Sequence, residues 1–186
     1  MIITINKPEK KVYNLFRWLG NVLDRHARDS TGVIKVNEDR TLLIATDKNA
    51  MVFARLIAPL TVLDDKAEYY RPIVISRDLI NLETMSVDYI NAGIFFSGLP
   101  EVGYGTVVRN KITIDSMLFK KATAGFGQVV IAINQINAPM WVTMNSDNFP
   151  AGAYFGMIMP MSGGKESERI AQSYNRIKKA FEQEGI

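Results

Sequence analysis

The chain lacks cysteine and contains a single histidine, His26, and both facts exclude common kinds of site. Without cysteine there is no disulfide and no thiolate metal site. One histidine cannot form a histidine-rich metal site, so we expect His26 to be an ordinary surface residue. Asp64 and Asp65 are adjacent carboxylates, but their polar surroundings are typical of an exposed loop and not of an acid–base pair. No P-loop, G-x-G-x-x-G or G-x-S-x-G motif is present. We therefore expect a protein that binds and does not catalyse, with no catalytic residue, metal or cofactor.

Long apolar runs are also lacking. The longest, residues 153–161, is interrupted by Gly156 and Pro160 and falls short of the roughly 18 residues that span a bilayer. The N-terminal residues are apolar first and basic afterwards, the reverse of a signal peptide. We therefore expect a cytoplasmic protein that is neither secreted nor inserted in a membrane, and the absence of cysteine fits a reducing compartment.

What is present is ordinary for a globular protein. The 186 residues are 47% hydrophobic and 22% charged, and the formal net charge is +3. A chain of this length can form one sizeable core or two small ones. The small positive excess permits nucleic-acid binding without requiring it, so the positions of the charges matter more than their sum.

The first hundred residues begin with a pattern of strand, helix and three strands. Residues 2–6 are predicted to form a strand, and Pro8 suits the first turn of a helix. Three strand-like runs, 32–36, 41–46 and 50–57, follow the helix and are separated by turn-forming residues. Apolar residues at helical spacing mark the buried side of the helix: Val12, Leu15, Phe16, Leu19, Val22 and Leu23.

The same pattern then recurs in a shorter second unit. Residues 72–76 are predicted to form a strand, and Ser76 is positioned to cap a short helix over residues 77–83. Three further strands are expected, at residues 86–90, 93–97 and 105–108.

A third unit begins at Lys111. Residues 111–114 are predicted to form a strand, and Asp115 or Ser116 to cap a helix that ends near residue 124. Three strands then follow, at residues 129–134, 140–144 and 153–159. The repeat is one of pattern and not of sequence, and it predicts an α+β fold in which helices lie on one face of antiparallel sheets.

Three regions follow from this pattern. Residues 1–106 would form a domain of two units, residues 107–161 a third half-domain unit, and residues 162–186 a hinge with an amphipathic C-terminal helix. In that helix Ile170 and Phe181 belong to a narrow apolar stripe flanked by charges of both signs. Such a stripe is expected to dock on this subunit or on a neighbour, and not on a membrane.

Basic residues recur on the polar sides of the predicted helices. Acidic residues, such as Glu9 and Asp24, lie there too, so one alternative is an ordinary solvated helix face. The other is contact with nucleic-acid phosphates, and its candidate residues are Lys10, Arg17, Arg25, Arg28, Arg77, Lys120 and Lys121.

Three segments along the chain carry a resemblance to a known family, and they are residues 41–56 (TLLIATDKNAMVFARL), 72–82 (PIVISRDLINL) and 157–161 (MIMPM). In this order they resemble segments of the bacterial DNA polymerase III beta subunit, the DNA sliding clamp. Residues 41–56 are similar to the stretch that holds the clamp's A-T-D-G-H-R-L motif. Residues 72–82 resemble its V-I-V-P-R-K-x-L-x-x-L element. Residues 157–161 resemble the V-M-P-M that closes the clamp chain. The resemblance covers residues 2–161 as a pattern and about forty residues as recognisable sequence.

The resemblance implies a fold and a function. In that family two strand–helix–three-strand units make a domain, and twelve units close a ring whose basic helices face duplex DNA. Contacts of this kind are independent of sequence and weaken with salt. By analogy, this chain would bind duplex DNA non-specifically, associate as a homo-oligomer, and tether a DNA polymerase or other replication protein as a processivity factor.

The family also has an apolar peptide groove. It is built partly from the segment that residues 41–56 resemble and partly from the segment that residues 157–161 resemble. Methionine suits such a groove because its flexible, polarizable side chain adapts to varied ligands. The alternative is that Ile158 and Met159 are buried strand residues and that Met161 belongs to a linker. The candidates that the resemblance implies are Thr46, Asn49, Met51, Ile158, Met159, Pro160 and Met161.

The chain also departs from the family. Lys48-Asn49-Ala50 replaces Gly-His-Arg, which removes two polar groove residues, and the C-terminal helix could cover the groove. Three units replace six, so four chains could complete a ring, while a dimer or a monomer stays open. A peptide-binding or regulatory clamp mimic that does not encircle DNA is therefore the alternative function, and an enzyme with an unrecognised site is a third.

Overall fold

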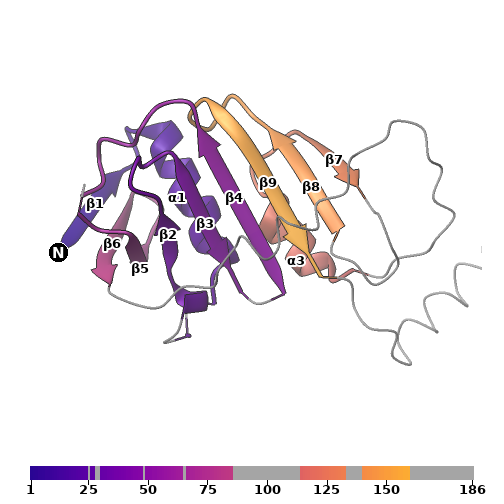
Figure 1. The fold of residues 1–186 in the computed structure, drawn as a ribbon, viewed down its shortest axis with the longest axis horizontal. Coiled ribbons are helices and arrows are strands. Elements are labelled where there is room, and N and C mark those ends of the chain that lie inside the picture. The colour runs from indigo at the N-terminus through magenta and orange to yellow at the C-terminus, as the bar shows by residue number, and fades with distance from the viewer. Residues whose placement is uncertain are drawn as a thin grey trace, which may run out of the picture.

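The computed structural model describes residues 1–24, 26–27, 30–47, 49–64, 66–85, 114–132 and 140–159. In these residues nine antiparallel strands form one sheet in the order β1-β6-β5-β2-β3-β4-β9-β8-β7. The predicted α+β class, with helices on one face of antiparallel strands, is confirmed (Figure 1). The elements are β1 (Ile2–Asn6), α1 (Lys10–Val22), a 3-10 turn (Ser30–Gly32), β2 (Ile34–Val36), β3 (Leu42–Thr46), β4 (Ala50–Leu56), β5 (Tyr69–Ile75), β6 (Leu79–Met85), α3 (Ser116–Thr123), β7 (Gln128–Ala132), β8 (Met140–Asn145) and β9 (Gly152–Ile158).

Helix α1 packs on the sheet and supplies much of the main core. Its apolar residues recur every three or four positions, so they share the side that packs on the sheet. The helix ends where Leu23 adopts an extended conformation. Of the predicted apolar stripe, Val12 is half-buried and the other five side chains are buried, together with Tyr13 and Trp18. The buried side chains are Tyr13, Leu15, Phe16, Trp18, Leu19, Val22 and Leu23.

The helix predicted for residues 77–83 is wrong. Residues Leu79–Met85 form strand β6, which pairs with both β1 and β5. The Ser76 hydroxyl does accept hydrogen bonds from the backbone N–H groups of Asp78 (3.3 Å) and Leu79 (3.0 Å), as a helix cap would. Here those bonds close the tight turn between β5 and β6, because serine offers the same local bond to turns and to helix starts.

Helix α3 was predicted correctly, and the structure decides between its two candidate caps. The Asp115 carboxylate accepts hydrogen bonds from the N–H groups of Met117 (2.7 Å) and Leu118 (3.3 Å). These bonds satisfy N–H groups that the first turn of a helix leaves without partners. Only Ala122 of this helix is fully buried, so α3 lies at the margin of the core.

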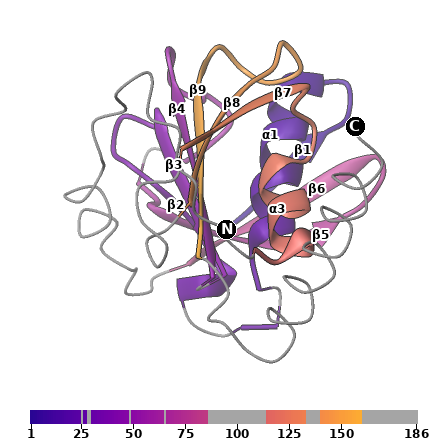
Figure 2. The same cartoon turned by 90° about the vertical axis from the view of Figure 1, so that its right-hand side faces the viewer.

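The centre of the sheet joins the first and third predicted units. Strand β4 pairs with β9 along its whole length, from Ala50 opposite Ile158 to Leu56 opposite Gly152. Figure 2 shows α1 and α3 on the same side of β3, β4, β9 and β8, with β5 and β6 beyond the helices. The strands predicted at residues 86–90, 93–97 and 105–108, residues 111–113 of the strand predicted at 111–114, the C-terminal helix and both domain boundaries lie outside the described residues.

Both faces of the central strands bury apolar side chains. Alternate residues of a strand point to opposite faces, so Ala50, Val52 and Ala54 join the main core under the helices. The residues between them contribute to a second buried cluster on the other face, which consists of Ile44, Met51, Phe53 and Met157. In the described part of the chain no helix is long and apolar enough to cross a bilayer.

Candidate nucleic-acid interface

Helices α1 and α3 are fastened to each other by one tryptophan. The indole Nε1 of Trp18 donates a buried hydrogen bond of 2.7 Å to the carbonyl oxygen of Ala122 in the last turn of α3. The ring also packs edge-on against Phe126, Phe149 and Tyr154, at centroid distances of 5.1 to 5.9 Å. Because the indole is buried, this contact fixes where the outer sides of the two helices lie relative to each other.

The outer side of α1 carries a row of cationic and amide side chains. Lys10, Asn14, Arg17 and Asn21 are spaced four, three and four residues apart, so they lie along one side of the helix. Lys10 and Arg17 are exposed, whereas Asn14 and Asn21 are half-buried. The Asn14 amide donates a 3.0 Å hydrogen bond to the carbonyl oxygen of Asn148, which ties this row to the β8–β9 turn.

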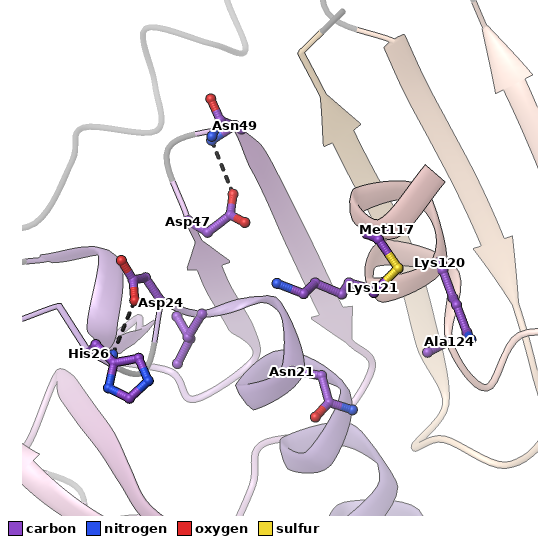
Figure 3. Close-up of a pocket in the computed structure, with 10 residues that line it drawn as sticks. Asn21, Asp24, His26, Asp47, Asn49, Met117, Lys120, Lys121 and Ala124 are labelled. Atoms are coloured by element: carbon purple, nitrogen blue, oxygen red, sulfur yellow. Dashed lines mark hydrogen bonds between the residues drawn. The ribbon is translucent and has the colours of Figure 1, made fainter. Parts of the chain in front are cut away.

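Two adjoining clefts run along this pair of helices. The first has a volume of about 680 Å³ and lies between the end of α1, the β3–β4 turn and α3; its lining includes Lys120 and Lys121 (Figure 3). The second, of about 510 Å³, is lined by Lys10 and Arg17 among others. Both clefts include Asn21 and Ala124. They therefore form one groove, which we call the helix groove, and the described residues supply two cations toward each of its ends.

The two ends of the helix groove differ in acidic residues. Asp24 and Asp47 line the first cleft opposite α3, and Figure 3 shows the Lys121 side chain extending into the space between them and the helix. Both carboxylates also accept backbone hydrogen bonds, Asp24 from His26 (3.1 Å) and Asp47 from Ala50 (2.7 Å). No acidic residue of the described chain lines the second cleft. One end of the groove is thus cationic and the other is mixed.

Beneath the second cleft lies a cluster of aromatic rings. Phe126 and Phe149 stack at 4.4 Å with an interplanar angle of 6°. Tyr154 packs against both rings and donates its hydroxyl hydrogen bond to the carbonyl oxygen of Pro150. Burial raises the pKa of Tyr154 because the charged phenolate would lose its hydration. The cluster is therefore a neutral, rigid floor and supplies no titrating group near neutral pH.

Arg77, a further predicted DNA contact, does not line the helix groove. Arg77 lies in the turn between β5 and β6, where its carbonyl oxygen accepts a hydrogen bond of 3.1 Å from the Tyr13 hydroxyl. It is exposed, but it is not on a helix as expected. Arg25 and Arg28 lie outside the described residues. The structure thus brings together Lys10, Arg17, Lys120 and Lys121 of the seven candidates.

The two segments implied for the peptide groove are neighbours in the sheet. Met51 lies opposite Met157, and the Met159 N–H donates a 2.8 Å hydrogen bond to the carbonyl oxygen of Asn49. The side chains divide between the two faces, because Ile158 is buried under the helices and Met51 in the cluster on the other face.

Exposure separates the peptide candidates further. Thr46 is buried, and its hydroxyl donates to the carbonyl oxygen of Ala50. Asn49 is exposed, and Met159 is 37% exposed, so these two present a surface at this end of the β4–β9 pair. Pro160 and Met161 lie outside the described residues.

Some residues of the helix groove could not be assigned to it from the sequence. Asp47 and Met117 reach it only through the pairing of β4 with β9 and the packing of α3 beside α1. The spacing of Lys10, Asn14, Arg17 and Asn21 was the available signal for the α1 side. Among the described residues there is no group of three or more His, Asp or Glu side chains that could hold a metal ion.

Comparison with known proteins identifies the fold. No family model matches the chain, and no curated protein matches it by sequence. Three solved structures of the Helicobacter pylori beta clamp are similar to it, in complex with 3,4-difluorobenzamide (TM-score 0.52, 9% identity), with diflunisal (0.53, 9%) and bound to a DNA ligase peptide (0.52, 10%). Each match covers 87% of this chain and 66% of the clamp chain, just under two thirds. The fold is clamp-like.

Proposed function

We propose that this chain is a clamp-like protein that binds duplex DNA through its sugar–phosphate backbone and holds a replication protein through an apolar peptide. The observation that carries the proposal is the pairing of α1 with α3, which places Lys10, Arg17, Lys120 and Lys121 along one groove of a clamp-like fold. Lysine and arginine side chains neutralise phosphates, and asparagine amides can donate hydrogen bonds to them.

Such contacts carry no sequence information, which suits a protein that moves along DNA. The four cations that the described residues bring to the groove are few for tight binding by one chain, so we expect a homo-oligomer that presents several helix grooves to the same duplex. Light scattering after gel filtration, with and without nicked circular duplex, tests this expectation. A strict monomer that gives the same elution with duplex would contradict it.

The DNA contact is tested by neutralising the groove. We expect Arg17→Gln/Lys120→Gln/Lys121→Gln to make the negative slope of log affinity against log salt shallower by about three, since each phosphate contact contributes roughly −0.9. Binding to a fluorescent duplex between about 50 and 200 mM salt measures the slope. The matched control is Arg55→Gln, because Arg55 is exposed on β4 and alternates with residues that face the helices. Equal slopes for the triple variant and the control would contradict the proposal.

The peptide contact is proposed for the exposed end of the β4–β9 pair, around Asn49 and Met159. Support comes from the resemblance of the two segments to the clamp's groove and from the clamp structure bound to a DNA ligase peptide. We expect Met159→Ala to weaken binding of a fluorescent clamp-motif peptide at least fivefold. Ile57→Ala is the control, because Ile57 is 80% exposed and follows β4 at the opposite end of the β4–β9 pair. Equal affinity of both variants would count against this surface.

Peptide binding without DNA binding would instead support the alternative, a regulatory module that uses the clamp-like fold without encircling DNA. The two assays above separate the alternatives, since one uses duplex without peptide and the other uses peptide without duplex.

A further inference from the structure

The mixed end of the helix groove has a chemistry that phosphate binding alone does not explain. Lys120 and Lys121 line one wall of the 680 Å³ cleft, and Asp24 and Asp47 line the opposite wall. A DNA phosphate that approached the lysines would also approach the carboxylates. The cationic end, around Lys10 and Arg17, has no acid of the described chain in its lining. Among the described residues, opposed charges therefore line the α3 end of the groove and not the end around Lys10 and Arg17.

We infer that Asp24 and Asp47 weaken the hold of Lys120 and Lys121 on DNA, so that the α3 end of the groove makes a loose contact. This inference rests on the proposed DNA-binding function and assigns to these carboxylates the role of setting its strength. A carboxylate repels a phosphate and attracts the same lysine that the phosphate would bind. Both effects reduce the gain in free energy when the phosphate arrives.

The size of the cleft sets the size of the effect. A space of about 680 Å³ is roughly 10 Å across, while the Debye length is about 10 Å at 0.1 M salt and about 30 Å at 0.01 M. At low salt a unit charge about 10 Å away in water changes affinity about twofold, and higher salt removes most of that change. Two carboxylates should therefore change affinity about threefold at low salt and hardly at all at high salt.

The hydrogen bonds of the two carboxylates allow a clean substitution. Asp24 accepts a bond from the His26 N–H, and Asp47 accepts from the N–H groups of Asn49 and Ala50. An asparagine carbonyl oxygen can accept the same bonds, so Asp24→Asn/Asp47→Asn removes charge while keeping these turns. Asp64→Asn is the matched control, because Asp64 accepts a 3.0 Å bond from the Lys66 N–H and lines neither cleft.

The test measures affinity for a fluorescent duplex at about 20 and about 200 mM salt, where screening differs most. We expect Asp24→Asn/Asp47→Asn to bind about threefold more tightly at the lower salt, to match the wild type at the higher salt, and to lose the gain when Lys120→Gln and Lys121→Gln are added. Urea unfolding confirms that the variants are folded.

The outcomes of this test separate a failure of the inference from a failure of the proposed function. If the wild type binds DNA but the asparagine variant binds no better, or Asp64→Asn binds as much better, the inference fails and the proposed function stands. If neither the wild type nor the variant binds DNA at low salt, the proposed function fails as well. Binding by the variant alone would support the inference in a stronger form.

Discussion

Helices α1 and α3 carry the same kind of charge on their outer sides, but the protein holds them in very different ways. Helix α1 has 13 residues and buries seven of them, including Leu15 and Phe16. Helix α3 has eight residues and buries Ala122 alone. Its position depends on the Asp115 cap and on the hydrogen bond from Trp18. The wall of the helix groove that α1 forms is therefore part of the core, whereas the wall that α3 forms lies at the edge of the core.

The largest expected difference between the helices is in stability. We expect Leu15→Ala to lower the free energy of unfolding by about 3 kcal/mol, because it leaves a cavity in the core under α1. Leu118→Ala, at a half-buried position of α3, should cost about 1 kcal/mol or less, since less apolar contact is lost. Urea unfolding of both variants measures the two costs. Equal costs would mean that α3 is as much a part of the core as α1.

The link between the helices gives a smaller effect. Trp18→Phe keeps an aromatic ring but removes the N–H that donates to the Ala122 carbonyl, leaving a buried acceptor without this partner. Such a loss costs about 1–3 kcal/mol. Hydrogen exchange should become faster in α3 and stay nearly unchanged in α1. Uniformly faster exchange in both helices would show that Trp18 supports the whole domain and not the attachment of α3.

The cap of α3 gives the smallest effect. Asp115→Ala removes the acceptor for the Met117 and Leu118 N–H groups and should cost about 1 kcal/mol, whereas Asp115→Asn should cost little because asparagine also caps helices. Fraying of α3 would loosen Lys120 and Lys121, so the alanine variant should bind duplex DNA slightly more weakly than the asparagine variant. Equal stability of the two variants would show that the Asp115 cap does not stabilise α3.

The helices show how much of the fold the sequence could predict. The stripe that includes Leu15 and Phe16 was enough to place α1, and an acidic residue before an apolar run was enough to place α3. The same reasoning failed at Ser76, since its hydroxyl bonds to the following N–H groups in a turn as well as in a cap. The better signal was the alternation of apolar Ile80 and Leu82 with polar Asn81 and Glu83, a strand pattern that β6 confirms. Seven residues are too few, however, to separate the two-residue period of a strand from the 3.6-residue period of a helix.

The helix groove was only partly predictable. Spacing along α1 was enough to align Lys10 with Arg17, because that relation is local. Placing Lys121 across a cleft from Asp24 and Asp47 required knowing that β4 pairs with β9 and that α3 lies beside α1. Those relations join residues far apart in the chain, and no local pattern specifies them. The two segments implied for the peptide groove lie on neighbouring strands, but the division of their side chains between two faces became visible only in the sheet.

The pairing of β4 with β9 also has a consequence for how the molecule forms. Strand β4 is complete at Leu56, yet its second neighbour arrives only when the ribosome has made residues 152–158. Contacts between such distant parts of a chain slow folding, because a long loop must close before they contribute. Until β9 has been synthesised, β4 is therefore an edge strand with apolar residues on both faces. That is the stage at which we expect a nascent chain to need a chaperone most.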